Sequence, residues 1–382
     1  MTEKPANRIY FSGLNSLRFF AALAVIITHI ELLKGAFGFK NYWRNPLFFN
    51  LGGLGVYFFF VLSGFLITYL LIMEKEKYST ISIKQFYLRR VLRIWPLYYL
   101  IVFLGFIVLP NFVFFNVPYL QQGFVSNFSI NLILYILILP NLAFSIFPAV
   151  PNIGQTWSIG VEEQFYIFWP WIILKSQSIL KTLLFIIVGL ILIKIGVLFL
   201  GKFYYDTSWY KTLKLFVAMS KFECMAIGGI GAYFLFTKNK LIAYFHNILI
   251  FLGSLCFIVL LIFYTPEKIQ DGVHIIYSIL FLNVILYCAK SNSNRFFENS
   301  IFKYLGKISY GIYMYHFMII PFVLFILKNY LNFNSEVFNN IFIYSTTIFL
   351  TILVSGFSYH YIERPFINMK EKFSPVKSGD KK

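Results

Sequence analysis

The chain has 382 residues, of which 59% are hydrophobic and only 13% are charged. A water-soluble domain carries about 25% charged residues, so this composition excludes a soluble globular protein and predicts an integral membrane protein. The formal net charge of +18 would suggest nucleic-acid binding in a soluble protein, but here the basic residues lie in short connections between apolar runs. That distribution is typical of cytoplasmic loops, so we expect membrane lipids around the chain and no nucleic acid.

Apolar runs long enough to cross a hydrocarbon core of roughly 30 Å recur from end to end of the chain. Runs of this kind form helices rather than a barrel, because a helix satisfies its own backbone polar groups. The ten predicted spans are residues 14–30, 53–73, 94–115, 159–174, 179–200, 216–236, 243–264, 273–289, 307–327 and 337–362. The stretch ISIKQFYLRRVLRIWP (81–96), which turns into the third span at about residue 94, is predicted to form an amphipathic interfacial helix.

The topology depends on residues 130–147, an apolar segment that could be an eleventh span or a re-entrant segment. It lies within residues 116–158, which contain no Lys, Arg, Asp or Glu, and is therefore placed outside the cytoplasm. If it does not cross, both termini are cytoplasmic together with the basic segments 74–93, 290–307 and 364–382. If it crosses, the tail with five lysines lies opposite the N-terminus. The first arrangement obeys the charge rule and is our prediction.

The first span carries one arginine near its start and one histidine near its end. Arg18 and His29 are 11 residues apart, so a helix brings them to within roughly 20° of the same face and about 16 Å apart along its axis. Ionisable groups are costly in hydrocarbon unless they face a protein interior or a watery cavity, which makes each a functional candidate. The alternatives are an Arg18 that reaches the interface and a His29 that bonds to a neighbouring helix.

A second polar group lies in residues 155–170, where Glu162 and Glu163 are adjacent at the start of a span, beside Trp157. We interpret Glu163 as an ordinary carboxylate near a helix N-terminus and retain Glu162 as a candidate functional residue. Topology places Glu162 at the same end as His29, and a carboxylate that accepts the imidazole N–H would orient a histidine base. The sequence therefore permits a pair between His29 and Glu162.

Three further residues are secondary candidates. His316 lies within a span and is expected to face the interior, where packing with a bound water competes with catalysis. Ser63 could act as a nucleophile, but in a run with several glycines it is better explained by close helix packing. Trp157 is included because it adjoins the two glutamates.

Glu363 and Arg364 predict a structural ion pair at a helix end, and no spacing typical of a metal site is present.

Six motifs in this order resemble the integral membrane acyltransferase-3 family of bacterial O-acyltransferases. They are the Arg-x10-His first span, FFFVLSGFLIT (58–68), FYLRRVLRIWP (86–96), TWSIGVEEQFYIFWP (156–170), ISYGIYMYH (308–316) and YIERPF (361–366). The resemblance covers most of the chain. It implies ten spans with both termini inside, the same topology that charge counting predicts.

The predicted fold class is thus all-α: a polytopic membrane helix bundle of about ten transmembrane helices with both termini cytoplasmic. Residues 1–370 form the membrane acyltransferase domain, and residues 371–382 are a disordered basic cytoplasmic tail. Family members often continue into an extracytoplasmic esterase-like domain, and since this chain stops after its tail, we expect a stand-alone form. The resemblance implies multi-pass insertion in the bacterial inner (plasma) membrane.

The resemblance also implies an activity and residue roles. It makes His29 the catalytic histidine, with Arg18 and Glu162 as partners, and it places Arg90 and Arg93 at the donor site. Two arginines three residues apart share a helix face and can hold phosphates bidentately, although they could instead bind anionic lipid head groups. The implied reaction is O-acetyltransfer from cytoplasmic acyl-CoA (acetyl-CoA), used as a substrate rather than a bound cofactor, to a hydroxyl of a cell-surface or exported polysaccharide. The rival function is a non-catalytic membrane carrier of a glycan or lipid-linked sugar, whose path could be lined by the same residues.

Overall fold

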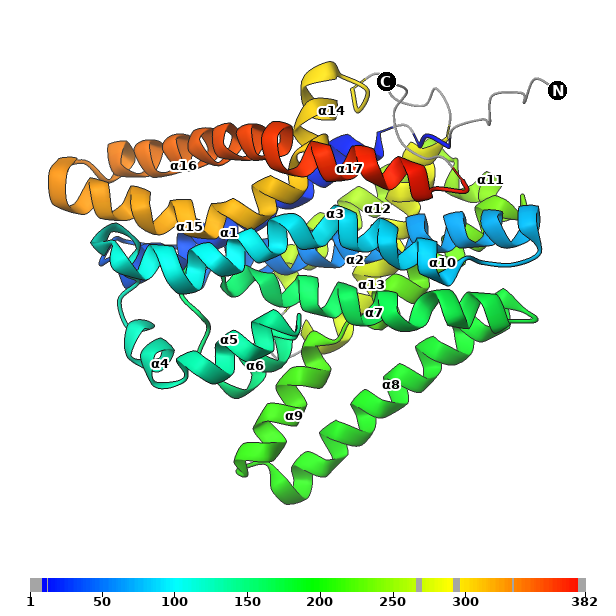
Figure 1. Ribbon diagram of the computed structural model, residues 1–382, viewed down its shortest axis with the longest axis horizontal. Coiled ribbons are helices and arrows are strands. Elements are labelled where there is room, and N and C mark those ends of the chain that lie inside the picture. Colours follow the sequence, from blue (N-terminus) through cyan, green and yellow to red (C-terminus); the bar gives the residue numbers. More distant parts are fainter. Residues whose placement is uncertain (1–8, 12, 266–269, 291–295, 332, 377–382) are drawn as a thin grey trace.

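The computed structural model describes residues 9–11, 13–265, 270–290, 296–331 and 333–376. Ten helices of this part are the long or apolar segments of the bundle (Figure 1). They are α1 (Leu14–Ala36), α2 (Pro46–Tyr78), α3 (Ile83–Phe103), α7 (Trp157–Lys175), α8 (Ile179–Tyr204), α10 (Phe222–Phe236), α12 (Ile248–Tyr264), α13 (Gln270–Ala289), α15 (Ser309–Ile326) and α16 (Glu336–Ser358).

Seven other helices have 12 residues or fewer, and each is by itself too short to span a membrane. They are α4 (Gln121–Ser126), α5 (Phe128–Ile136), α6 (Pro140–Ile146), α9 (Ser208–Met219), α11 (Ile242–Phe245), α14 (Ser300–Lys307) and α17 (Arg364–Lys370). Tighter or wider turns extend some helices of both groups. They include π-turns at Leu104–Val108, Leu327–Leu331 and Tyr359–Glu363 and a 3₁₀ turn at Glu371–Phe373. No strand occurs in the described ranges, which confirms the predicted all-α class.

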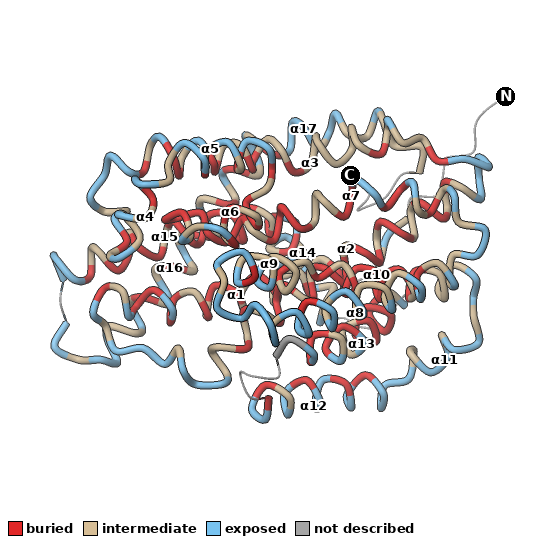
Figure 2. Tube along the Cα trace, turned by 90° about the horizontal axis from the view of Figure 1, so that it is seen from below, coloured by how far each residue is buried: buried red, intermediate tan, exposed pale blue. Residues whose placement is uncertain are grey.

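Eight helical segments of the described chain are long and apolar enough to cross a membrane, and one of them, Ser208–Phe236, contains both α9 and α10. The helix α12 is apolar but shorter, at 17 residues, and α7 has 19 residues that include two glutamates. With these two the segments correspond to the ten predicted spans. Buried residues gather along α1, α2, α10, α13 and α15 in the middle of the bundle, whereas α12 lies at its edge (Figure 2).

Residues 130–147 form no spanning helix. They are divided between α5, with nine residues, and α6, with seven, joined by a turn in which Ile138 has a positive φ of 57°. Nine residues of helix cover only about 14 Å, less than half of a hydrocarbon core. This short hairpin favours the topology with ten spans.

The first and last described segments lie at one end of the bundle, with the basic residues. The Tyr10 hydroxyl donates to Glu298 before α14, and the Tyr78 hydroxyl, at the end of α2, donates to the Pro375 carbonyl over 3.2 Å. Arg89 donates to the Phe373 carbonyl over 2.9 Å. We call this the basic end of the bundle. Residues 371–373, which the sequence assigned to the tail, are therefore held against α3, and residues 377–382 lie outside the described residues.

The charge rule predicts that the basic end faces the cytoplasm. A reporter enzyme that is active only outside the cytoplasm, fused after Lys382, should therefore stay silent, whereas the same reporter inserted after Tyr119 in the uncharged segment should be active. Enzyme activity in whole cells measures both fusions. A strong signal from the C-terminal fusion would reverse the assigned orientation of the basic end.

Glycines allow the two central helices to approach closely. A Cβ atom on Gly64 of α2 would lie 1.9 Å from the Met225 carbonyl oxygen, and one on Gly228 of α10 would lie 2.0 Å from the Val61 carbonyl oxygen. Only glycine fits at such contacts, because packing of transmembrane helices relies on small residues. The glycines of the second span thus serve the packing role that the sequence indicated.

Two predicted segments differ from the structure. The stretch 81–96 does not form a separate interfacial helix, because α3 runs without a break from Ile83 to Phe103 despite Pro96. The predicted span 216–236 is interrupted at Ser220 and Lys221, where the backbone leaves the helical region, so that α9 turns away from α10. In Figure 1, α8 and α9 diverge from the rest of the bundle as a hairpin.

Candidate active site

A cavity of about 610 Å³ opens among α1, α2, α3, α7, α15 and α17 at the basic end. Its polar lining comes from segments that are far apart in the sequence. Ten of these polar side chains are Arg18, Ser63, Arg90, Arg93, Ser158, Glu162, Tyr166, Tyr310, Tyr313 and Glu363. The cavity therefore brings together Arg18, Glu162 and the arginine pair, as well as the secondary candidate Ser63.

Arg18, Arg90, Arg93 and Arg364 line the cavity. Within the described ranges, none of Arg18, Arg90 and Arg93 forms an ion pair shorter than 4.0 Å. Arg18 donates to the Asn15 side-chain oxygen over 3.2 Å, and the Arg90 guanidinium lies 5.6 Å from the centre of the Tyr166 ring. Several unpaired guanidinium groups around one space form a site suited to a polyanion.

A chain of hydroxyl groups connects α2 to the candidate carboxylate. The Tyr166 hydroxyl donates to Glu162 over 2.9 Å, and Ser63 lies 2.6 Å from the same hydroxyl. Because an ionised carboxylate only accepts, the Tyr166 hydrogen points to Glu162 and Ser63 donates to Tyr166. The Ser63 hydroxyl is thus engaged as a donor, and both interpretations of Ser63, as a nucleophile and as a packing residue, stay predictions.

The first-span histidine pairs with another histidine instead of with Glu162. His29 Nδ1 lies 2.8 Å from His316 Nε2, and the two ring planes are within 9° of parallel with centroids 5.1 Å apart. Phe317 meets the His29 ring edge-on at 4.9 Å. The expected pairing of His29 with Glu162 is not formed, because α15 packs along α1 at this level and α7 does not.

Tyr313 links the cavity to the histidine pair. Its hydroxyl lies 2.6 Å from the Ser158 hydroxyl and donates to the Gln155 carbonyl over 2.9 Å. Its ring, one turn before His316 in α15, has its centroid 5.8 Å from the His316 ring centroid. Tyr313 and Ser158 line the cavity and His29 does not. The Tyr313 side chain thus lies between the cavity and the histidine pair.

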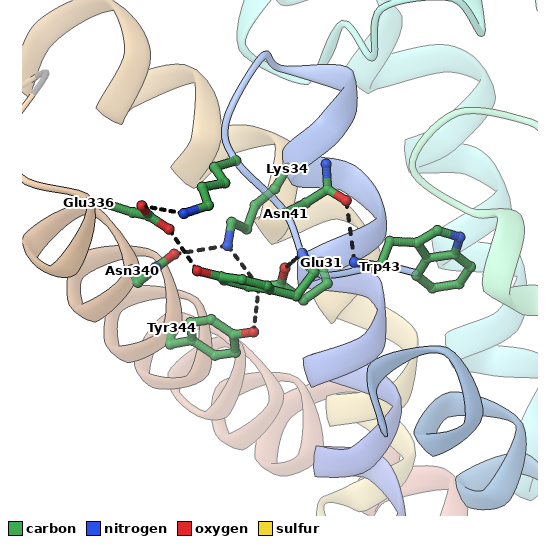
Figure 3. Close-up of polar contacts among 9 residues, drawn as sticks. Glu31, Lys34, Asn41, Trp43, Glu336, Asn340 and Tyr344 are labelled. Carbon is green, nitrogen blue, oxygen red and sulfur yellow. Dashed lines mark hydrogen bonds and ion pairs between the residues drawn. The ribbon is translucent and has the colours of Figure 1, made fainter. Parts of the chain in front are cut away.

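A buried polar network follows His29 at the opposite end of the bundle (Figure 3). Glu31 and Lys34 are each 1% exposed and form an ion pair of 2.7 Å. Lys34 also donates to the Asn340 side-chain oxygen over 2.8 Å, and the Tyr344 hydroxyl donates to Glu31 over 2.7 Å. These contacts join α1 to α16. A buried pair is stable only when its remaining bonding capacity is satisfied, and here α16 supplies the partners.

Glu363 differs from its sequence interpretation. It forms no ion pair with Arg364 within 4.0 Å in the described chain, and its carboxylate faces the cavity, where Arg93 is its charged neighbour. The helix does not end there either, because the π-turn Tyr359–Glu363 leads directly into α17. The wider turn rotates Glu363 inward, and nothing in the local sequence predicts that rotation.

Some candidates lie away from the cavity. Trp157 does not line it and instead packs edge-on against Phe60 at 6.3 Å. Glu163 accepts a hydrogen bond of 2.9 Å from the Trp95 indole, so the two adjacent glutamates face different neighbours. No group of three potential metal ligands occurs in the part of the chain that the structure describes.

The sequence pattern of a known family, described as an acyltransferase domain, matches residues 11–360. The chain belongs to the acyltransferase-3 family. The curated members of this family that it matches are longer, and it spans 56–61% of their length. No solved structure matches the chain.

Three relatives illustrate the similarity. A Staphylococcus aureus (strain COL) protein named "Putative O-acetyltransferase SACOL0978" is 29% identical over 94% of this chain and 57% of its own length. The protein named "Putative peptidoglycan O-acetyltransferase YrhL" from Bacillus subtilis (strain 168) is 27% identical over 96% of this chain and 56% of its own length. "O-acetyltransferase OatA" from Staphylococcus aureus (strain NCTC 8325 / PS 47) is 28% identical over 99% of this chain and 61% of its own length.

Sequence reasoning within the acyltransferase-3 motifs missed several cavity residues. Tyr166 follows Glu162 by four positions and so shares its helix face, a signal that was available. Tyr313 and His316 are three apart in α15, which gives the same signal. Lys370 of α17 also lines the cavity, but it lies beyond the last motif and carries no sequence signal of its own.

Proposed function

We propose that this chain is a membrane O-acyltransferase that moves an acyl group, acetyl in the first instance, from cytoplasmic acyl-CoA to a hydroxyl of a cell-surface or exported polysaccharide. We place it in the bacterial plasma membrane. The observation that carries the proposal is the cavity itself, where Arg18, Arg90 and Arg93 form no ion pair within 4.0 Å in the described chain and which reaches inward from the basic end to Tyr313 beside the histidine pair. We propose acetyl as the transferred group because the relatives are named O-acetyltransferases.

Acyl-CoA suits the basic end of the cavity because it carries several phosphate charges at one end and a neutral thioester at the other. Guanidinium groups bind phosphates bidentately, which favours Arg90 and Arg93 as the donor site. The alternative, contact with lipid head groups, fits less well, because Arg90 lies over the rings of Phe86 and Tyr166 and lines an internal cavity.

His29 is the proposed general base. The carbonyl groups of Ile312 and Tyr313 lie close to the buried His316 ring, although His316 Nδ1 forms no hydrogen bond of good geometry. A carbonyl only accepts, so this position favours a hydrogen on His316 Nδ1, and His316 Nε2 then accepts from His29 Nδ1. This assignment leaves the lone pair on His29 Nε2. His316 is therefore a positioning residue that sets the tautomer of the base.

In the proposed reaction, His29 Nε2 takes the proton of the acceptor hydroxyl while the hydroxyl oxygen attacks the thioester carbonyl. The carbon–sulfur bond breaks, the thiolate leaves with the electron pair and receives the proton, and the products are the ester and free coenzyme A. Glu162, which accepts from Tyr166 beside the arginines, acts on the donor side in this scheme rather than on His29.

Radiolabelled acetyl-CoA tests the proposal on the purified full chain in lipid nanodiscs. We expect slow release of acetate without acceptor and labelled polymer when a cell-wall or capsular polysaccharide is added. His29→Ala should lose both activities while it still binds coenzyme A. Absence of hydrolysis, transfer and coenzyme A binding in the wild type would instead favour the carrier function.

A further inference from the structure

The helix α17 and the turn after it form one wall of the cavity, beside α3. Figure 1 shows α17 lying along α3 at the end of the chain. The segment is fixed at two points, where Arg89 donates to the Phe373 carbonyl and Tyr78 donates to the Pro375 carbonyl. Residues 367, 368, 370, 371 and 374 of this segment contribute to the cavity lining. The C-terminal segment is thus part of the site that the proposed function assigns to the donor.

The charges of this wall repel those of the facing helix. The amino group of Lys370 has Arg90 and Arg93 as like-charged neighbours, together with Arg89, which is paired with Glu74 over 3.1 Å, and Glu371 is an opposing charge. Lys370 forms no ion pair within 4.0 Å in the described chain, and Arg90 Nε is buried without a hydrogen-bond partner. Cations gathered in this way repel one another, and an anion bound between them offsets that repulsion.

We propose that Lys370 binds the ribose 3′-phosphate of the acyl-CoA donor, while Arg90 and Arg93 bind its diphosphate. The inference rests on the proposed function. The order of the groups follows from the cavity, because the thioester must point inward toward Tyr313. The ribose phosphate is the group farthest from the thioester and therefore lies toward the outer wall. Lys370 occupies that wall, since it lines both this cavity and the small adjoining hollow beside Arg89.

Binding of coenzyme A and of dephospho-coenzyme A, which lacks the 3′-phosphate, tests this role on the purified full chain by calorimetry. Wild type should bind coenzyme A about tenfold or more tightly than the dephospho form, as expected for a charge-assisted hydrogen bond. Lys370→Ala should lose that preference by weakening only coenzyme A binding, and Lys370→Arg should keep it. Lys372→Ala is the matched control, because Lys372 is exposed two residues along and does not line the cavity.

The outcomes separate this inference from the proposed function. If wild type and Lys370→Ala bind coenzyme A equally well, the donor site stands and the role of Lys370 is wrong. If Lys370→Ala weakens both ligands equally, Lys370 does not recognise the 3′-phosphate and the inference is also wrong. If wild type binds neither ligand, the donor site fails and the inference fails with it.

Discussion

His29→Ala is expected to abolish acyl transfer while the protein remains folded in the membrane. General-base catalysis typically contributes about 10²- to 10⁴-fold, and no other group is placed to supply it in the proposed mechanism. His29 keeps one nitrogen for the substrate because the other is bonded to His316 over 2.8 Å. Initial rates of transfer from radiolabelled acetyl-CoA measure the effect.

The matched control is His246→Ala, because His246 lies in the turn before α12 and does not line the cavity. It should keep wild-type activity. His316→Gln should lower the rate less than His29→Ala, because it removes the partner that sets the tautomer and leaves the base in place. A His29→Ala variant with more than about a tenth of wild-type activity would exclude His29 as the general base.

Arg90→Ala and Arg93→Ala should each weaken coenzyme A binding by roughly tenfold to a hundredfold. The reason is the loss of charge-assisted hydrogen bonds, which contribute about 1.5 to 3 kcal/mol apiece. Lysine at either position should restore binding only in part, because it keeps the charge but lacks the planar fork. Binding of wild type should also weaken as salt is added. Calorimetry at two ionic strengths measures all three effects.

Arg44→Ala provides the control for these variants, since Arg44 is an exposed arginine in the loop before α2 and lies outside the cavity lining. Its affinity for coenzyme A should equal that of wild type. Unchanged affinity in both Arg90→Ala and Arg93→Ala would remove the arginine pair from the donor site and leave lipid contact as its role.

The fold was largely predictable because hydropathy and charge decide where a helix crosses a membrane. The ten apolar runs correspond to helices, and the uncharged segment 116–158 contains only short ones. Breaks inside a span were not predictable. The interruption at Ser220 and Lys221 and the π-turn before Arg364 arise from packing against neighbouring helices, which leaves no periodic signal in the sequence.

The candidate site was predictable as a set of residues but not as a set of pairs. Polar residues in apolar spans are costly, so Arg18, His29 and Glu162 could be identified one by one. Their partners depend on which helices are neighbours and on how each is rotated. His29 meets His316 because α15 lies along α1, whereas Glu162 turns toward Tyr166 and the arginines. The sequence fixes neither contact.

The bonds that hold Tyr313 also bear on the permeability of the membrane. A continuous watery path from the basic end to His29 would let ions leak down their gradients and discharge the electrical potential across the bilayer. The Tyr313 hydroxyl is held by Ser158 and Gln155, and its ring closes the inner end of the cavity beside His316. Under the proposed function, the donor arm that carries the acyl group would have to displace this ring to reach His29 and would occupy its place, so the reactant itself would keep the barrier sealed while the transfer takes place.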